Sequence, residues 1–205
     1  MKKIFTIAFV GRSGAGKSYA ANYLRSKGVK TIDCDDLAKR VVEVQFDCLG
    51  ELAIEFGDDI LYEDGTLNRQ MLAMKAFSNA EQKSKLDRIT HPYILSELNN
   101  ELKKLELAGE SFCIIEAAAL FESKQQDSID KIVLISSSYE SCFERIIERD
   151  SIDKEKASMR LAMQMKDNEL LDKVDMVIYN NGSKEDFEKK LNILFDKLQE
   201  WSIGR

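Results

Sequence analysis

The stretch that decides the fold is IFTIAFVGRSGAGKS, residues 4–18. Its first part, Ile4–Val10, is an apolar run rich in β-branched side chains, which is typical of a buried strand. The second part, Gly11–Ser18, matches GxxxxGK[ST], the pattern of a phosphate-binding loop (P-loop) that follows a strand and opens a helix. The stretch therefore predicts an α/β protein that binds a purine nucleoside triphosphate.

The residue types of this loop have a chemical reason. Glycines let successive backbone N–H groups wrap a phosphate, and the following helix N-terminus adds the positive end of its dipole. Lys17 is expected to reach the β- and γ-phosphate oxygens, and Ser18 is expected to ligate Mg²⁺. The nucleotide-contacting set predicted here is Gly11, Ser13, Gly14, Ala15, Gly16, Lys17, Ser18 and Tyr19. The alternative is a glycine turn that holds no ligand.

Further apolar runs follow along the chain and alternate with stretches of helical periodicity. They are Val29–Asp33, Phe112–Ala117, Lys131–Ser136 and Asp175–Asn180. Such alternation predicts a five-stranded parallel sheet with crossover helices, a three-layer P-loop fold. We expect one domain over residues 1–205, with a helical insertion at about 37–109 and a helical lid at about 140–172.

The insertion reads as helix after helix without a strand pattern. We expect breaks at Phe56–Asp59, Glu63–Gly65, Ser78–Asn79 and His91–Pro92. The last break contains the one histidine and the one proline of the chain. For His91 we weigh a structural role at a helix break against direct contact with a substrate.

Composition narrows the functional classes. The 205 residues are 44% hydrophobic and 32% charged, as in an ordered globule with one sizeable core. A net charge of −6 gives no global positive field, so we expect neither nucleic acid nor a membrane as partner. The four cysteines form no CxxC pair, which favours reduced thiols and the cytoplasm. The run Ile4–Val10 is too short for a signal peptide or a membrane span.

Acidic residues end two of the predicted strands. Asp33 stands where a parallel sheet holds its ligands, and a carboxylate there can accept the proton of an attacking hydroxyl. Asp33 and Asp35 alternatively solvate a loop or cap the helix that begins near Asp36. Glu116, at the end of the third strand, is a candidate to orient Mg²⁺ waters or to bind basic lid groups.

Two arginines in the predicted lid lie one helical turn apart. Arg145 and Arg149 project from the same helix face, which suits the charge spread over a γ-phosphate in transfer. An exposed helix with Glu144 and Glu148 as salt-bridge partners is the alternative. Arg160 and Gln164 have the same four-residue spacing, but the argument that they belong to the site is weaker.

An ordered set of motifs over about Ile4 to Trp201 resembles the dephospho-CoA kinase family. Beyond the P-loop and the Ile32-Asp33-x-Asp35 strand end, the set comprises Asp64-Gly65-x-Leu67-x-Arg69, His91-Pro92, Leu120-Phe121-Glu122, Arg149-Asp150, Gln164 and Asp175-x-x-Ile178-x-Asn180-x-Gly182. The chain departs from the usual family residues at Tyr19, Val44-Gln45, Ala118 and Leu170, and its Arg12 is bulkier than expected.

The resemblance implies transfer of the ATP γ-phosphate to the ribose 3′-hydroxyl of dephospho-CoA, with Mg²⁺. It implies that Asp33 is the general base, that Lys17 and Ser18 handle phosphate and metal, and that Arg145 and Arg149 belong to the lid. It also places Asn180 and Gly182 beside the adenine of ATP. Asp33, Asp35, Arg69 and His91 are then the residues on the acceptor side.

Other functions remain open at this point. Another small-acceptor P-loop kinase, acting on a nucleoside, nucleotide or sugar acid, shares the loop, the base and the lid arginines. A nucleotide-binding switch or a non-catalytic relative is the alternative from another class, although no [NT]KxD guanine-reading motif is present. We expect a monomer or a weak homo-oligomer.

Overall fold

The computed structural model describes residues 3–116 and 129–203. The motif Leu120-Phe121-Glu122 and the departure at Ala118 lie outside these described residues. The chain divides into two compact units, the first made of Met1–Asp33 with Lys104–Arg205 and the second of Cys34–Lys103.

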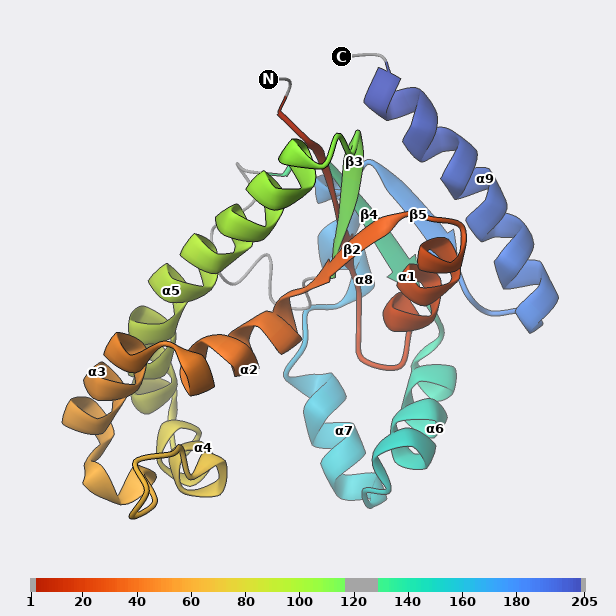
Figure 1. Cartoon of the computed structure of the whole chain (residues 1–205). Coiled ribbons are helices and arrows are strands. Elements are labelled where there is room, and N and C mark those ends of the chain that lie inside the picture. Colours follow the sequence, from red (N-terminus) through yellow and green to blue (C-terminus); the bar gives the residue numbers. More distant parts are fainter. Residues whose placement is uncertain (1–2, 117–128, 204–205) are drawn as a thin grey trace. The chain divides into compact units, whose positions relative to one another are not determined.

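A five-stranded parallel sheet is the centre of the first unit (Figure 1). Its strands are β1 Phe5–Val10, β2 Lys30–Asp33, β3 Phe112–Glu116, β4 Lys131–Ser136 and β5 Met176–Tyr179. The strand order β2-β3-β1-β4-β5 places β3 between the P-loop strand and the strand that ends at Asp33. All four neighbouring pairs are parallel, so the carboxyl ends of the strands meet at one edge of the sheet. The predicted α/β fold is confirmed.

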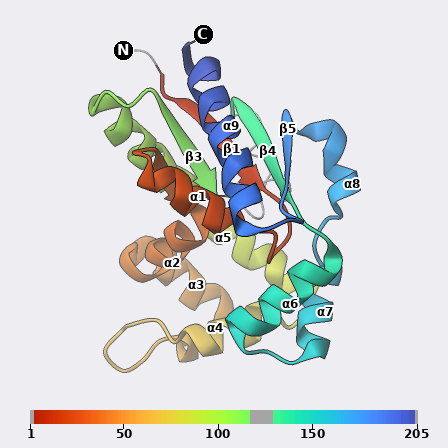
Figure 2. The same cartoon turned by 90° about the vertical axis from the view of Figure 1, so that its right-hand side faces the viewer.

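Helices cover this sheet and extend past its carboxyl edge. They are α1 Lys17–Ser26, α6 Tyr139–Asp150, α7 Lys154–Ala162, α8 Asp167–Leu170, the 3₁₀ turn Leu171–Lys173 and α9 Lys184–Ile203. Helices α1 and α9 contact each other and lie on one face of the sheet (Figure 2). Buried side chains of β1, α1, α6, α7 and α9 form one hydrophobic core, to which α1 contributes Ala20, Ala21 and Leu24. The core thereby fixes the helix that follows the P-loop.

The second unit is helical, as the absence of a strand pattern predicts. It contains α2 Cys34–Val44, α3 Phe46–Phe56, the 3₁₀ turn Asp58–Ile60, α4 Arg69–Ala76 and most of α5 Ala80–Leu107. A tight turn precedes α4: the Asp64 carboxylate accepts the Thr66 N–H at 2.9 Å, and Leu61 and Leu67 form an antiparallel bridge. Asn68 then caps α4 by accepting the Met71 N–H at 3.1 Å.

The break expected at His91–Pro92 is wrong. Helix α5 runs without interruption from Ala80 to Leu107, with Pro92 inside it. Proline has no N–H, so the carbonyl of Arg88 loses its helical partner, but one lost bond weakens a helix without ending it. The neighbouring turns hold, because Ile89, Thr90 and Leu98 are buried.

Candidate functional site

The P-loop wraps the N-terminus of α1, and its glycines are needed for this path. Gly16 precedes the helix at φ 107°, a conformation that favours glycine. A Cβ atom on Gly16 would stand 2.5 Å from Nδ2 of Asn180. The Lys17 ammonium lies over the loop and donates to the carbonyls of Gly11 at 2.6 Å and Arg12 at 3.0 Å. The loop is therefore a closed cradle with a cation above it.

Arg145 is fixed beside this cradle. Its guanidinium donates to the carbonyl of Gly14 at 3.1 Å, to the Ser137 hydroxyl at 3.2 Å and to the carbonyl of Asn180 at 3.4 Å. The acceptors come from the P-loop, the end of β4 and the end of β5. One cation of α6 thus joins three loops at the carboxyl edge of the sheet.

The turn after β5 supports the P-loop from its other side. The buried Asn180 side chain donates to the carbonyl of Ala15 at 2.9 Å. Asn181 accepts the Ser138 N–H at 2.8 Å, so the turn that continues to Gly182 is tied to the segment after β4. The predicted Asn180–Gly182 turn therefore lies against the P-loop.

A carboxylate pair with a hydroxyl gathers at the ends of β2 and β3. Asp33 and Glu116 are paired in the strand register, and the Ser18 hydroxyl is near enough to Glu116 to lower the pKa of that carboxyl. Burial raises the pKa of Glu116, and the nearby charge of Asp33 raises it further. Three neighbours lower the pKa of Glu116 and so oppose this rise: Ser18, Arg25 and Lys17. A terminal nitrogen of Arg25, in α1, lies 3.8 Å from a carboxylate oxygen of Glu116.

Arg149, in the last turn of α6, lies in a separate network of ion pairs. Its Nε and one terminal nitrogen donate to the two carboxylate oxygens of Asp150 at 2.7 and 2.9 Å. Asp150 also accepts a bond from Arg160 at 2.6 Å. The hydrogen bond from Arg149 lowers the pKa of Asp150. The acidic partner is Asp150 and not Glu144 or Glu148, the partners in the alternative interpretation, and Arg149 remains more than half exposed.

The Tyr19 side chain faces α9. Its hydroxyl hydrogen-bonds to Glu188, and its ring lies 5.8 Å from the ring of Phe187. The bond to Glu188 raises the pKa of Tyr19 to about 12. Only the backbone of Tyr19, in the first turn of α1, remains for a phosphate contact.

The second unit holds the predicted acceptor-side residues Asp35, Arg69 and His91. Asp35 is exposed in the first turn of α2. Arg69 begins α4 and donates to Glu43 at 2.9 Å and to the carbonyl of Lys39 at 3.2 Å. His91, on α5, has its Nε2 3.8 Å from the Asp87 carboxylate one helical turn earlier. Arg69 and His91 thus each have an acidic neighbour within this unit.

Comparison with known proteins decides the family. The sequence profile described as dephospho-CoA kinase matches residues 5–186. The dephospho-CoA kinase of Listeria innocua is 37% identical over 186 residues, which cover 91% of this chain and 93% of that protein. The chain belongs to the dephospho-CoA kinase family. It is an ATP-dependent phosphotransferase whose acceptor is dephospho-CoA.

Solved structures agree with this family. The dephospho-CoA kinase from Campylobacter jejuni superposes with a TM-score of 0.72 at 27% identity, covering 97% of this chain and 98% of that one. A Thermus thermophilus protein reaches a TM-score of 0.81 at 30% identity, covering 96% and 99%. A shikimate kinase from Bacteroides thetaiotaomicron, at 14% identity and a TM-score of 0.50, shares the fold alone.

Sequence reasoning on this dephospho-CoA kinase missed two contacts of the P-loop. Gln164, for which the sequence argument is weak, binds Ser13, and Nε of Arg12 lies 3.5 Å from the Asp167 carboxylate. No spacing rule links residues about 150 positions apart. The order of the family motifs was the one signal that could have pointed to Gln164.

Proposed function

We propose that this dephospho-CoA kinase performs its reaction at the carboxyl edge of the sheet, with Asp33 as the general base. The 3′-hydroxyl oxygen of dephospho-CoA forms a bond to the γ-phosphorus of ATP while the bond from phosphorus to the β–γ bridging oxygen breaks. Asp33 takes the hydroxyl proton, and ADP leaves. The observation that carries this proposal is the position of Asp33 at the end of β2, in register with Glu116 beside Ser18.

The residues around Glu116 fit Mg²⁺. This cation prefers oxygen ligands and keeps several waters, so it needs only one or two protein groups. Ser18 and Glu116 supply a hydroxyl and a carboxylate, and Ser18 is near enough to Glu116 to lower the pKa of that carboxyl. When bound with ATP, Mg²⁺ neutralises charge on the β- and γ-phosphate oxygens. We assign Ser18 to the metal directly and Glu116 to its water shell.

Three cations serve the phosphates in this proposal. Lys17 reaches the β- and γ-phosphates from above the P-loop, and Arg145 adds fixed positive charge beside Gly14. Arg149 is exposed on the lid and is proposed to contact the γ-phosphate as negative charge spreads over its oxygens. The adenine is assigned to the side of the Asn180–Gly182 turn.

The helical insertion is proposed as the acceptor side. Arg69 is held by Glu43 and the Lys39 carbonyl, which gives a positioned cation suited to the diphosphate of dephospho-CoA. Asp35 and His91 are proposed as further acceptor contacts. The helices at about 140–172 are proposed as the lid.

Two general properties complete the proposal. Within residues 3–116 and 129–203, no helix combines the length and apolar character needed to cross a membrane. All four cysteines are free thiols, which supports a reducing compartment, and we propose the cytoplasm.

We propose a monomer or a weakly associating homo-oligomer, which sedimentation over a range of protein concentrations tests.

The role of Asp33 is tested by Asp33→Asn with Asp36→Asn as the control. Asp36 is an exposed carboxylate three residues further on, paired with Lys39. Loss of a general base lowers turnover by about 10²–10⁴-fold. We expect that loss in Asp33→Asn, with an unchanged dissociation constant for ATP, and full activity in Asp36→Asn. Near-normal turnover of Asp33→Asn would overturn the assignment.

A further inference from the structure

The connector, defined here as residues 163–167, links α7 to the first residue of α8 and holds the P-loop at Ser13. Oε1 of Gln164 accepts the backbone N–H of Ser13 at 2.9 Å, and Nε2 of Gln164 donates to the Ser13 hydroxyl at 2.9 Å. One carboxamide thus satisfies both the backbone and the side chain of a single residue. Two bonds from one rigid group fix orientation as well as distance.

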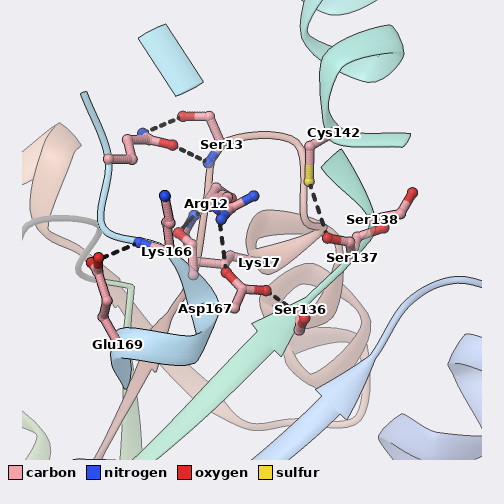
Figure 3. A network of polar contacts seen from close by, with 12 residues as sticks. Arg12, Ser13, Lys17, Ser136, Ser137, Ser138, Cys142, Lys166, Asp167 and Glu169 are labelled. Carbon is pink, nitrogen blue, oxygen red and sulfur yellow. Dashed lines mark hydrogen bonds and ion pairs between the residues drawn. The ribbon is translucent and has the colours of Figure 1, made fainter. Parts of the chain in front are cut away.

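The same connector meets the preceding P-loop residue. Oδ1 of Asp167 lies 3.5 Å from Nε of Arg12, and both side chains are at most 20% exposed. Asp167 also accepts a hydrogen bond from Ser136 at the end of β4 (Figure 3). Within the described part of the chain, neither Nε of Arg12 nor Oδ1 of Asp167 has a hydrogen-bond partner, although both atoms are buried. The contact is therefore an ion pair in a shielded place, where removal of one partner is costly.

The adjacent P-loop residues Arg12 and Ser13 thus contact two side chains of the connector that lie three positions apart in the sequence. The next two residues are also held, since Arg145 binds the Gly14 carbonyl and Asn180 binds the Ala15 carbonyl. Arg12 to Ala15 therefore form a continuous segment in which every residue contacts a side chain from the C-terminal half. Such a segment loses little further freedom when a ligand binds, which is the basis of preorganisation.

We propose that Gln164 is a positioning residue for ATP, which together with Asp167 holds Arg12 and Ser13 in the nucleotide-binding conformation before ATP arrives. This inference rests on the proposed function, namely that Gly11–Ser18 holds the ATP phosphates. We call the contacts of Gln164 and Asp167 with Ser13 and Arg12 the clamp. Because the clamp shapes the loop in the ground state and the transition state alike, its loss weakens ATP binding and leaves the chemical step nearly unchanged.

The test is Gln164→Met, which removes both hydrogen bonds at similar side-chain size. Asn168→Met is the control, because Asn168 is an exposed amide four residues further on. We measure the dissociation constant for MgATP by calorimetry without acceptor, together with kcat, KM for ATP and the melting temperature. Two net hydrogen bonds correspond to about a tenfold change in affinity. We expect that rise in the dissociation constant and in KM, kcat within about threefold of the parent, and an unchanged control.

A second variant keeps the inference testable if Gln164→Met folds poorly. Ser13→Ala removes only the hydroxyl bond and retains the backbone bond. We expect about a threefold weaker affinity for MgATP from one lost bond. In Gln164→Met/Ser13→Ala the two effects should not add, since both variants remove the same hydroxyl bond.

Two outcomes overturn the clamp: unchanged MgATP affinity in Gln164→Met, or a loss confined to kcat. Lys17→Met, measured alongside, separates this failure from failure of the proposed ATP site. If Lys17→Met loses MgATP affinity while Gln164→Met does not, the clamp alone is wrong. If neither loses affinity, the assignment of the P-loop to ATP is wrong.

Discussion

Asp33 and Glu116 are register partners at the carboxyl ends of the adjacent parallel strands β2 and β3. Burial and the charge of Asp33 both raise the pKa of Glu116, so its ionised form is held at a cost in stability. The nearby Ser18 hydroxyl, which lowers the pKa of Glu116, offsets part of that cost. The site thus keeps two carboxylates together where the proposed metal and the attacking hydroxyl meet.

We expect Glu116→Gln to stabilise the fold and to impair catalysis. Because the pKa of Glu116 is raised in the folded state, its contribution to stability is present below the unfolded pKa and is lost as pH rises through the folded pKa. Glutamine does not ionise, so the variant does not lose this stability as pH rises. Urea unfolding should therefore give a larger free energy of unfolding for the variant at pH 7. The gain should disappear at pH 4, below the ordinary value of 4.5.

Turnover of Glu116→Gln should fall about 10–100-fold, as for other groups that orient metal-bound waters. The Mg²⁺ concentration needed for half-maximal activity should rise at the same time. A gain in stability that is equal at pH 4 and pH 7 contradicts the electrostatic explanation. Unchanged activity contradicts the metal assignment.

Lys17→Met should weaken both nucleotide binding and turnover. The ammonium donates to the carbonyls of Gly11 and Arg12, so it is held at the loop that is proposed to bind the phosphates. Loss of a charge-assisted hydrogen bond predicts ATP binding weaker by about 10–100-fold. Calorimetry with MgATP measures this, and Lys189→Met on the exposed face of α9 is the matched control.

Arg149→Gln should lower turnover while leaving ATP affinity within a few-fold of the parent. Removal of one donor to developing negative charge costs about 10²–10³-fold in kcat. Arg160→Gln is the comparison, because Arg160 is the other arginine bound to Asp150. Equal losses in the two variants would mean that Arg149 only orders the Asp150 network, and full activity of Arg149→Gln would mean that it decorates a surface helix.

The sheet could be predicted from the sequence because each strand is a short apolar run with a local signature. Ile4–Val10 and Lys131–Ser136 read as buried strands, and nearly all of their side chains are buried. The P-loop was equally readable, since its glycines and Lys17 follow a fixed spacing. Strand order was not readable, because pairing depends on contacts between segments far apart in the chain.

Side-chain partners were the least predictable part of the site. Arg149 pairs with its direct neighbour Asp150 rather than with a residue one turn away, and Tyr19 turns toward Glu188. The family resemblance supplied roles for single residues, but it gave no contact between Gln164 and Ser13. Such contacts follow from tertiary packing, which leaves no periodic trace in the sequence.

Pro92 lies inside α5, although proline has the lowest helix propensity and the sequence predicts a break there. This position therefore gives a prediction about stability. Proline inside a helix removes one hydrogen bond and costs about 3 kcal/mol relative to alanine. Because α5 continues through Pro92, Pro92→Ala restores a donor for the Arg88 carbonyl. We expect the free energy of unfolding to rise by about 1–3 kcal/mol, part of the gain being offset by the freer unfolded chain. A destabilised Pro92→Ala would show that the proline conformation is required.

The most direct test of the account is ADP release from MgATP with dephospho-CoA as acceptor, with the product identified by mass. Adenosine, AMP, dCMP and gluconate serve as competing acceptors in parallel reactions. The account predicts ADP release that depends on dephospho-CoA alone, with one phosphate added to yield CoA, and loss of this activity in Asp33→Asn. Release with another acceptor, or no release with dephospho-CoA, would contradict it.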